Sequence, residues 1–171
     1  MAETDPHAKT IVFCADQDHA RQLRRALHNL NLELAAEAGA QGTEYVARVT
    51  SDAGERGGGF LDRFQDPEND FPVILTTSQL LTTGVDAPTC KNVVLVRTVG
   101  TTTEFKQIIC RGTRIKEDYG KLDFHILDHI GTANAKFADD EFVNPPDGKE
   151  GPGLIRALRE YSATATSSAQ P

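Results

Sequence analysis

Short runs of apolar and β-branched residues recur along the chain, and polar or helix-forming stretches separate them. The runs cover residues 9–14, 45–50, 73–77, 92–96 and 122–127. Runs of this length that are bounded by turn residues are typical of buried strands. Because strands that alternate with helical segments usually form a parallel sheet, the pattern predicts an α/β fold with a mainly parallel central sheet and helices on both faces.

A helical pattern follows the first of these strands. Asp16 is suited to cap the start of a helix, and the apolar residues beyond it recur at the three-four spacing of an amphipathic helix. These apolar residues are Ala20, Leu23, Leu27, Leu30 and Leu34, and Arg21, Arg24 and Arg25 lie between them. We expect one helix that ends near Gly39.

A glycine-rich segment, SDAGERGGG, covers residues 51–59 and contains four glycines. Glycine leaves the backbone unusually free, so this segment is expected to be a mobile loop. It is either a plain surface linker or a segment that becomes ordered against DNA or a partner domain. A short helix is expected to include residues 60–64.

Residues 107–114, QIICRGTR, form the segment with the clearest potential for chemistry. On a helix, Gln107, Arg111 and Arg114 have the spacing i, i+4 and i+7 and therefore share one face. The apolar residues of the same helix, which point the opposite way into a core, are Phe105, Ile108 and Ile109. Arginine suits a phosphate because its planar fork stays charged and donates two parallel hydrogen bonds. The segment is either a phosphate-binding helix or an ordinary solvated basic helix.

Two neighbouring sequence patterns help to decide between a phosphate-binding helix and an ordinary solvated basic helix. Thr101 and Glu104 have the spacing of a capping box, which favours the start of a helix there. Upstream, residues 73–88, VILTTSQLLTTGVDAP, change from a β-branched strand into a polar loop that ends at a proline. Ligands of open α/β sheets bind at the carboxyl ends of the strands, where such loops gather. This loop is therefore expected to lie at the edge of the sheet where a ligand would bind.

Together the two segments resemble the fifth and sixth motifs of superfamily 2 helicases and translocases, which lie in the second of two RecA-like domains. The family loop has the form T-x-x-x-x-x-x-G-x-D. The resemblance implies that Thr77 contacts a nucleic-acid phosphate, and that Gly84 and Asp86 lie beside the nucleotide with the aspartate near the ribose. The other hydroxyl residues at strand ends are candidate neutral donors to DNA phosphates, or simple caps of helices and turns. These residues are Thr50, Ser51 and Thr76.

The family form of the arginine helix is Q-x-x-G-R-x-G-R. The resemblance implies that Gln107 faces the nucleotide, and that Arg111 and Arg114 reach its γ-phosphate across a domain cleft. Cys110 stands where the family usually has glycine, and residues 112–113, Gly-Thr, replace the usual order before the last arginine. The two arginines keep their spacing, so these departures concern helix packing more than the arginine role.

The remainder of the chain agrees with this placement. The strand at residues 9–14 and the helix after it resemble the fourth helicase motif. Residues 120–142 resemble the close of the motor domain in type I restriction enzymes, as do the TTGVDAP loop and the R-G-T-R order. The resemblance covers residues 9–143 and implies a RecA-like three-layer sandwich. Residues 1–8 are expected to be a flexible segment, and residues 144–171 a linker that can form a short helix and a disordered tail.

The chain lacks a G-x-x-x-x-G-K-[ST] loop for phosphates and an acidic strand end for Mg²⁺. We therefore expect the second half of an ATP-dependent motor, either an excised domain or a part of a longer polypeptide. ATP and Mg²⁺ would be bound mainly by a first RecA-like domain that is absent from this chain. The expected partners are that domain, double-stranded DNA and, in a restriction system, the methylation and specificity subunits.

Charge and composition restrict the function further. The formal net charge is −7, so any DNA contact is expected to be a narrow strip of localised donors. No apolar run approaches the roughly 20 residues of a membrane helix, and the amino terminus lacks the pattern of a signal peptide. The three cysteines have no C-x-x-C spacing and are expected to be buried thiols in a reducing cytoplasm. The scattered histidines, including His125 and His129, favour structural roles over a metal site.

Other interpretations stay open. A non-catalytic nucleic-acid-binding or interaction domain would keep the fold, but it would have no reason to retain Gln107, Arg111 and Arg114. Another DNA-directed helicase, such as a repair helicase, would share the motifs. A self-sufficient doubly wound enzyme with a small-molecule substrate would need a glycine fingerprint after the first strand, and CADQDHA at that point has none.

Overall fold

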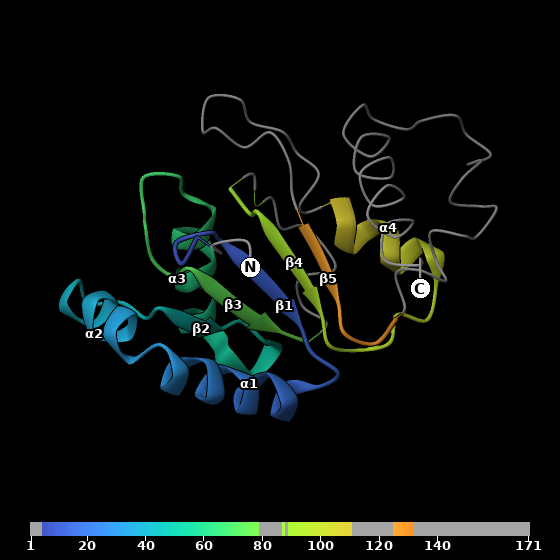
Figure 1. Cartoon of the computed structure of the whole chain (residues 1–171), viewed down its shortest axis with the longest axis horizontal. Coiled ribbons are helices and arrows are strands. Elements are labelled where there is room, and N and C mark those ends of the chain that lie inside the picture. The colour runs from blue at the N-terminus through green and yellow to red at the C-terminus, as the bar shows by residue number, and fades with distance from the viewer. Residues whose placement is uncertain (1–4, 79–86, 88, 111–124, 132–171) are drawn as a thin grey trace, which may run out of the picture.

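The computed structural model describes residues 5–78, 87, 89–110 and 125–131. These residues form a five-stranded sheet with the order β2-β3-β1-β4-β5, and every neighbouring pair is parallel (Figure 1). The strands are β1 Thr10–Phe13, β2 Val46–Arg48, β3 Ile74–Thr77, β4 Asn92–Leu95 and β5 His125–Asp128. The predicted α/β fold with a parallel sheet is confirmed.

The register of the central strands aligns their carboxyl-terminal residues with one another. Phe13, the last residue of β1, lies opposite Thr77 of β3 and Leu95 of β4. All five strands therefore end at the same carboxyl edge of the sheet, which is where a parallel sheet offers its loops to ligands.

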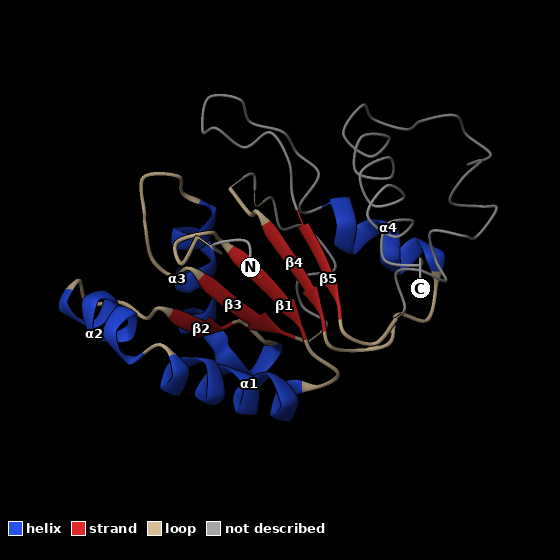
Figure 2. Ribbon diagram, viewed as in Figure 1, coloured by secondary structure: helices blue, strands red, loops and turns tan. Residues whose placement is uncertain are grey.

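Helices cover both faces of the sheet (Figure 2). The helices are α1 Gln17–Leu30, α2 Leu32–Ala40, α3 Gly54–Gln65 and α4 Thr102–Cys110, and a short 3-10 helix, η1, covers Ser51–Ala53. Helices α1 and α2 pack on one face, and α3 and α4 contribute side chains to the core on the other. The result is the predicted three-layer arrangement.

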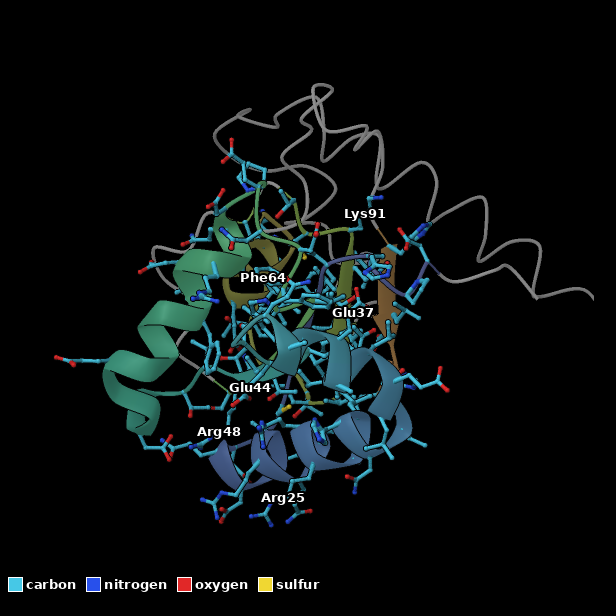
Figure 3. The ribbon with its side chains drawn as sticks, turned by 90° about the vertical axis from the view of Figure 1, so that its left-hand side faces the viewer. Arg25, Glu37, Glu44, Arg48, Phe64 and Lys91 are labelled. Carbon is cyan, nitrogen blue, oxygen red and sulfur yellow. The ribbon has the colours of Figure 1, made fainter. Side chains whose placement is uncertain are left out.

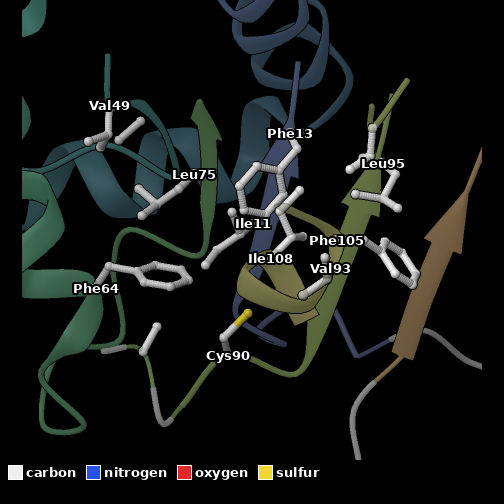
Figure 4. Close-up of a cluster of buried hydrophobic side chains, with 13 residues drawn as sticks. Ile11, Phe13, Val49, Phe64, Leu75, Cys90, Val93, Leu95, Phe105 and Ile108 are labelled. Carbon is white, nitrogen blue, oxygen red and sulfur yellow. The ribbon is translucent and has the colours of Figure 1, made fainter. Parts of the chain in front are cut away.

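The larger core lies between the sheet and the α3 and α4 layer (Figure 4). Side chains alternate along β1, so Ile11 and Phe13 enter this core while Val12 packs on the α1 face. Phe64 of α3 and Phe105 of α4 are fully buried against the sheet. Burial of large apolar side chains, at about 1.5–3 kcal/mol each, holds the layers together.

The single helix expected after β1 is divided into two. The start is as predicted, because the Asp16 carboxylate accepts a hydrogen bond from the His19 N–H at 2.7 Å. The helix stops at Asn31, whose side-chain amide donates to the Leu27 carbonyl at 2.8 Å and whose backbone leaves the helical region. Leu30, one of the apolar residues of the expected helix, is 80% exposed as a result.

The expected end near Gly39 is confirmed within one residue, because α2 ends at Ala40. The Thr43 N–H returns to the Ala38 carbonyl at 3.0 Å. Gly42 between them has a φ of +71°, a conformation that glycine adopts without strain.

The prediction of a mobile loop over residues 51–59 is wrong. These residues form η1 and the first half of α3 instead. Each glycine in a helix costs about 1 kcal/mol relative to alanine, but α3 packs Phe60, Leu61 and Phe64 into the main core. That burial outweighs the weak helix propensity of the glycines.

Candidate functional site at the carboxyl edge of the sheet

The predicted pair of Thr101 and Glu104 caps the start of α4. The Glu104 N–H donates to the Thr101 hydroxyl oxygen at 3.1 Å, which caps the helix. The Glu104 carboxylate, however, accepts from the Gly100 N–H at 3.3 Å and from the guanidinium of Arg97. The cap is thus extended by an ion pair that the sequence pattern did not reveal.

Helix α4 has the two faces that its spacing predicts. Phe105 and Ile108 are fully buried, whereas Gln107 is exposed. The side chain of Ile109 and the residues Arg111 and Arg114 lie outside the described residues. The described part of the helix therefore presents Gln107 on the side away from the core.

The predicted loop residues Gly84 and Asp86 also lie outside the described residues. The strand that leads to this loop ends in Thr76, Thr77 and Ser78, all of which are buried. Thr76 donates a long hydrogen bond of 3.5 Å to the Ala47 carbonyl. The Thr77 hydroxyl is fully buried and has no hydrogen-bond partner among the described residues. A buried hydroxyl without a partner is unusual and is often found where a ligand binds or strain is stored.

Thr50 and Ser51, at the end of β2, are bound within the protein. The hydroxyl of Thr50, which is 2% exposed, donates to the Asp52 carboxylate, and Ser51 accepts from the Gln17 amide at 2.8 Å. The Thr50 hydroxyl and the Arg48 guanidinium hold the pKa of Asp52 below its ordinary value. Asp52 therefore stays ionised at neutral pH, and Ser51 is the more accessible of the two hydroxyl residues.

Arg97 and Cys14 lie at the carboxyl ends of the two adjacent strands β4 and β1. Burial raises the pKa of the Cys14 thiol to about 11. Arg97 is 9% exposed, and its Nε has no hydrogen-bond partner among the described residues. The only sequence signal for Arg97 was a charged residue directly after an apolar strand, which is equally typical of a surface loop.

The prediction of buried cysteine thiols is borne out in part. Cys14 and Cys90 are buried thiols, and the side chain of Cys110 lies outside the described residues. His125 and His129 are exposed. Within the part of the chain that the structure describes, no group of three or more His, Cys, Asp or Glu side chains could hold a metal ion. No helix in that part is long and apolar enough to span a membrane.

The comparison with protein families identifies the family of this domain. Residues 1–116 match the model of the helicase conserved C-terminal domain. The chain belongs to this family of helicase C-terminal domains. The predicted resemblance to the second RecA-like domain of superfamily 2 helicases is therefore confirmed.

Individual relatives agree with this assignment. The chain is 51% identical over 147 residues to the endonuclease subunit of the type I restriction enzyme EcoAI from Escherichia coli, covering 86% of this chain and 17% of that protein. A solved fragment assigned to the HsdR subunit of a type I restriction enzyme from Vibrio vulnificus YJ016 has 60% identity and a TM-score of 0.77, covering 86% of this chain and 28% of that one. The predicted similarity to type I restriction enzymes is confirmed.

A more distant structure shows that the fold is shared. The helicase Lhr from Mycobacterium smegmatis has a TM-score of 0.54 at 17% identity, covering 71% of this chain and 15% of that one. The chain thus spans less than a third of the length of each of these three proteins.

Proposed function

We propose that this chain is the second half of an ATP-dependent DNA translocase or helicase motor, from the motor subunit of a type I restriction enzyme. The observation that supports this most strongly is the 51% identity to an endonuclease subunit of such an enzyme, combined with membership of the helicase C-terminal family. ATP and Mg²⁺ would be held mainly by a first RecA-like domain. ATP hydrolysis would supply the energy for movement along DNA.

Helix α4 would carry the nucleotide-facing side chains of this half. Gln107 is exposed on the face opposite to the buried Phe105 and Ile108, as a residue that meets a ligand across a cleft must be. Arg111 and Arg114 continue the same face in the sequence. Their guanidinium groups would offset the charge that develops on the transferring phosphoryl group, a contribution of about 10³- to 10⁵-fold in rate for arginine fingers in general. Gly84 and Asp86 would border the same nucleotide.

The DNA backbone would be gripped at the carboxyl edge. Thr77 supports this role because its buried hydroxyl lacks a partner among the described residues. Ser51 is exposed at the start of η1, which follows the neighbouring strand β2. The Thr50 hydroxyl already donates within the protein, so this residue would contribute through its backbone N–H. The Thr76 hydroxyl donates to the Ala47 carbonyl and the Thr76 carbonyl accepts from the Val49 N–H, so Thr76 would hold the shape of the strand end. Such contacts hold the DNA without reading its sequence.

The proposed setting is a cytoplasmic restriction system. The partners would be double-stranded DNA, the first RecA-like domain, and the methylation and specificity subunits. A non-catalytic binding domain, or a part of another DNA-directed helicase, would be the alternative.

The proposal is tested by DNA-stimulated ATP hydrolysis. The chain is assayed alone and after addition of a separately purified first domain of the same motor that contains the Walker motifs. We expect turnover only in the mixture, and we expect Arg114→Ala or Arg111→Ala to abolish it while DNA binding stays nearly unchanged. Arg63→Ala is the matched control, because Arg63 is an exposed arginine near the end of α3.

Each other outcome has a definite meaning. Turnover by the chain alone would require a complete nucleotide site within it, and the half-motor proposal would be wrong. Turnover that survives both arginine substitutions would refute the arginine assignment. DNA binding by the mixture without any turnover would favour the non-catalytic alternative.

A further inference from the structure

A pocket of about 360 Å³ lies at the β2 edge of the sheet, between α1 and α3. We call it the arginine pocket. It is lined by Arg21, Arg24, Arg25, Glu44, Arg48, Asp52, Gly57 and Phe60. Figure 3 looks onto this edge, with Arg25 on α1 and with Glu44 and Arg48 between α1 and α3. The predicted site residues within the described part of the chain do not line it, namely Thr50, Ser51, Thr76, Thr77 and Gln107.

The pocket follows from the local sequence of α1 and β2. Arg21, Arg24 and Arg25 are spaced i, i+3 and i+4, so they share one side of α1 while Ala20 and Leu23 face the core. Arg48 comes from the edge strand β2. Two rigid elements therefore direct four arginines into one space.

The charges of this space are not balanced. Arg24 Nη2 lies 2.7 Å from Glu44 Oε2, and Arg48 Nη1 lies 3.0 Å from Asp52 Oδ2, so these two arginines have partners within the pocket. Among the described residues of the lining, four arginines nevertheless face two carboxylates. This local excess of positive charge contrasts with the net charge of −7 for the whole chain.

The surplus lies on Arg21 and Arg25. Arg21 pairs at 2.9 Å with Asp18 outside the pocket, and both side chains are well exposed, at 47% and 73%. An exposed pair of this kind contributes little and exchanges readily. Arg25 has no ion pair among the described residues. Both guanidinium groups are therefore available to an anion that enters from solvent.

Hydrogen bonds link the pocket and the first turn of α1 to the carboxyl edge. Asp52, which accepts from Arg48 of the pocket, also accepts the hydroxyl hydrogen bond of Thr50. Gln17, in the first turn of α1, donates to Ser51 at 2.8 Å. Asp52 thus connects the arginine pocket directly to Thr50, at the strand end that is proposed to meet DNA. An anion bound in the pocket would therefore lie next to that DNA.

We propose that the arginine pocket binds a backbone phosphate of the DNA, and so extends the DNA track from the strand ends to the outer edge of the domain at α1. This inference rests on the proposed function. The exposed guanidinium groups of Arg21 and Arg25 bind successive backbone phosphates as the DNA moves past. Arg24 and Arg48, which are fixed by Glu44 and Asp52, hold the shape of the pocket. A contact of this kind suits a motor, because it grips any sequence equally.

The test is the salt dependence of DNA binding by the 171-residue chain. The double variant Arg21→Gln/Arg25→Gln is compared with the control Arg63→Gln/Lys91→Gln, which changes the net charge equally at exposed or half-buried residues outside the pocket. Binding to a duplex without a specific site is followed by fluorescence anisotropy from low to moderate salt. We expect the pocket variant to bind about tenfold more weakly at moderate salt and to lose about 1 from the slope of log K against log salt for each phosphate released. The control should bind like wild type.

The outcomes separate this proposal from the proposed function. If the pocket variant matches the control while Thr77→Val weakens DNA binding, the DNA track exists but does not reach the pocket. If the wild-type chain itself does not bind DNA at low salt, both proposals fail. If polyglutamate binding falls in the pocket variant while DNA binding does not, the pocket is an acidic-protein site and the phosphate proposal is wrong. Far-ultraviolet circular dichroism checks that both variants are folded.

Discussion

Arg97, just beyond the carboxyl end of β4, forms an ion pair with Glu104 in the first turn of α4. Arg97 is largely buried, with 8% of its side chain exposed, and the Glu104 side chain is 28% exposed. Because the pair joins the end of a central strand to the start of the helix that bears Gln107, it fixes the direction in which that helix leaves the sheet. Two residues that are not proposed to contact a ligand thereby orient Gln107, which is proposed to do so.

The first prediction concerns this pair. Glu104→Gln keeps the size of the side chain but leaves Arg97 charged and without its counter-ion, so we expect the free energy of unfolding to fall by about 1–3 kcal/mol. In the reassembled motor we expect kcat for ATP hydrolysis to fall while the affinity for DNA is unchanged, because the helix is less firmly oriented. Urea denaturation and steady-state ATPase assays measure the two effects. Glu55→Gln, at an exposed position of α3, is the control and should change neither.

The second prediction compares adjacent threonines. Thr77→Val removes a buried hydroxyl that has no partner among the described residues, so we expect stability to be unchanged or slightly increased. Thr76→Val removes the hydrogen bond to the Ala47 carbonyl and should cost up to about 1 kcal/mol. Only Thr77→Val should weaken DNA binding and DNA-stimulated ATP hydrolysis. A normal DNA response from Thr77→Val would remove this residue from the proposed DNA contact.

The sequence pattern was sufficient for the sheet because burial on both faces leaves a strong signal. Ile11, Val12 and Phe13 are consecutive apolar residues, and they become buried on alternate faces of the central strand β1. The capping threonine and the buried and exposed faces of α4 could also be predicted, since they depend on spacing within one helix. Local rules are reliable where the neighbouring residues alone decide the outcome.

Features that depend on tertiary contacts could not be predicted. Asn31 fits the interior of a weak helix, and only its bond to the Leu27 carbonyl identifies the break. The glycines of α3 favour a loop locally, but the core positions of Phe60 and Phe64 decide for a helix. The arginine pocket could not be predicted for the same reason, because Arg48 joins the arginines of α1 only when β2 packs beside them.

The third prediction concerns Lys9, a buried lysine at the start of the sheet. Its ammonium donates to the carbonyls of Phe64 at 2.9 Å and Asp66 at 3.0 Å, and it lies 5.5 Å from the centroid of the Phe64 ring. Lys9→Met would leave both carbonyls without this donor, so we expect a loss of about 2 kcal/mol in urea denaturation. Lys91→Met is the control. Its ammonium lies 3.8 Å from an exposed Asp5 carboxylate, and loss of that pair should cost less than about 0.5 kcal/mol. Equal losses in the two variants would contradict a structural role for Lys9.

The fourth prediction concerns the pH dependence that follows from Cys14. Burial raises the pKa of its thiol from an ordinary value of 9.0 to about 11, so the folded protein holds this proton more tightly than the unfolded chain does. The corresponding stability is fully present below pH 9 and is lost as the pH rises toward 11, with about 1.4 kcal/mol for each unit of pKa difference. We expect wild type to lose more stability over this window than Cys14→Ala, in urea denaturation under reducing conditions. The comparison cancels the lysines and tyrosines that titrate in both proteins. Parallel pH profiles would mean that the Cys14 thiol ionises equally in the folded and unfolded states, and the thiol would then have to be open to solvent in the native protein.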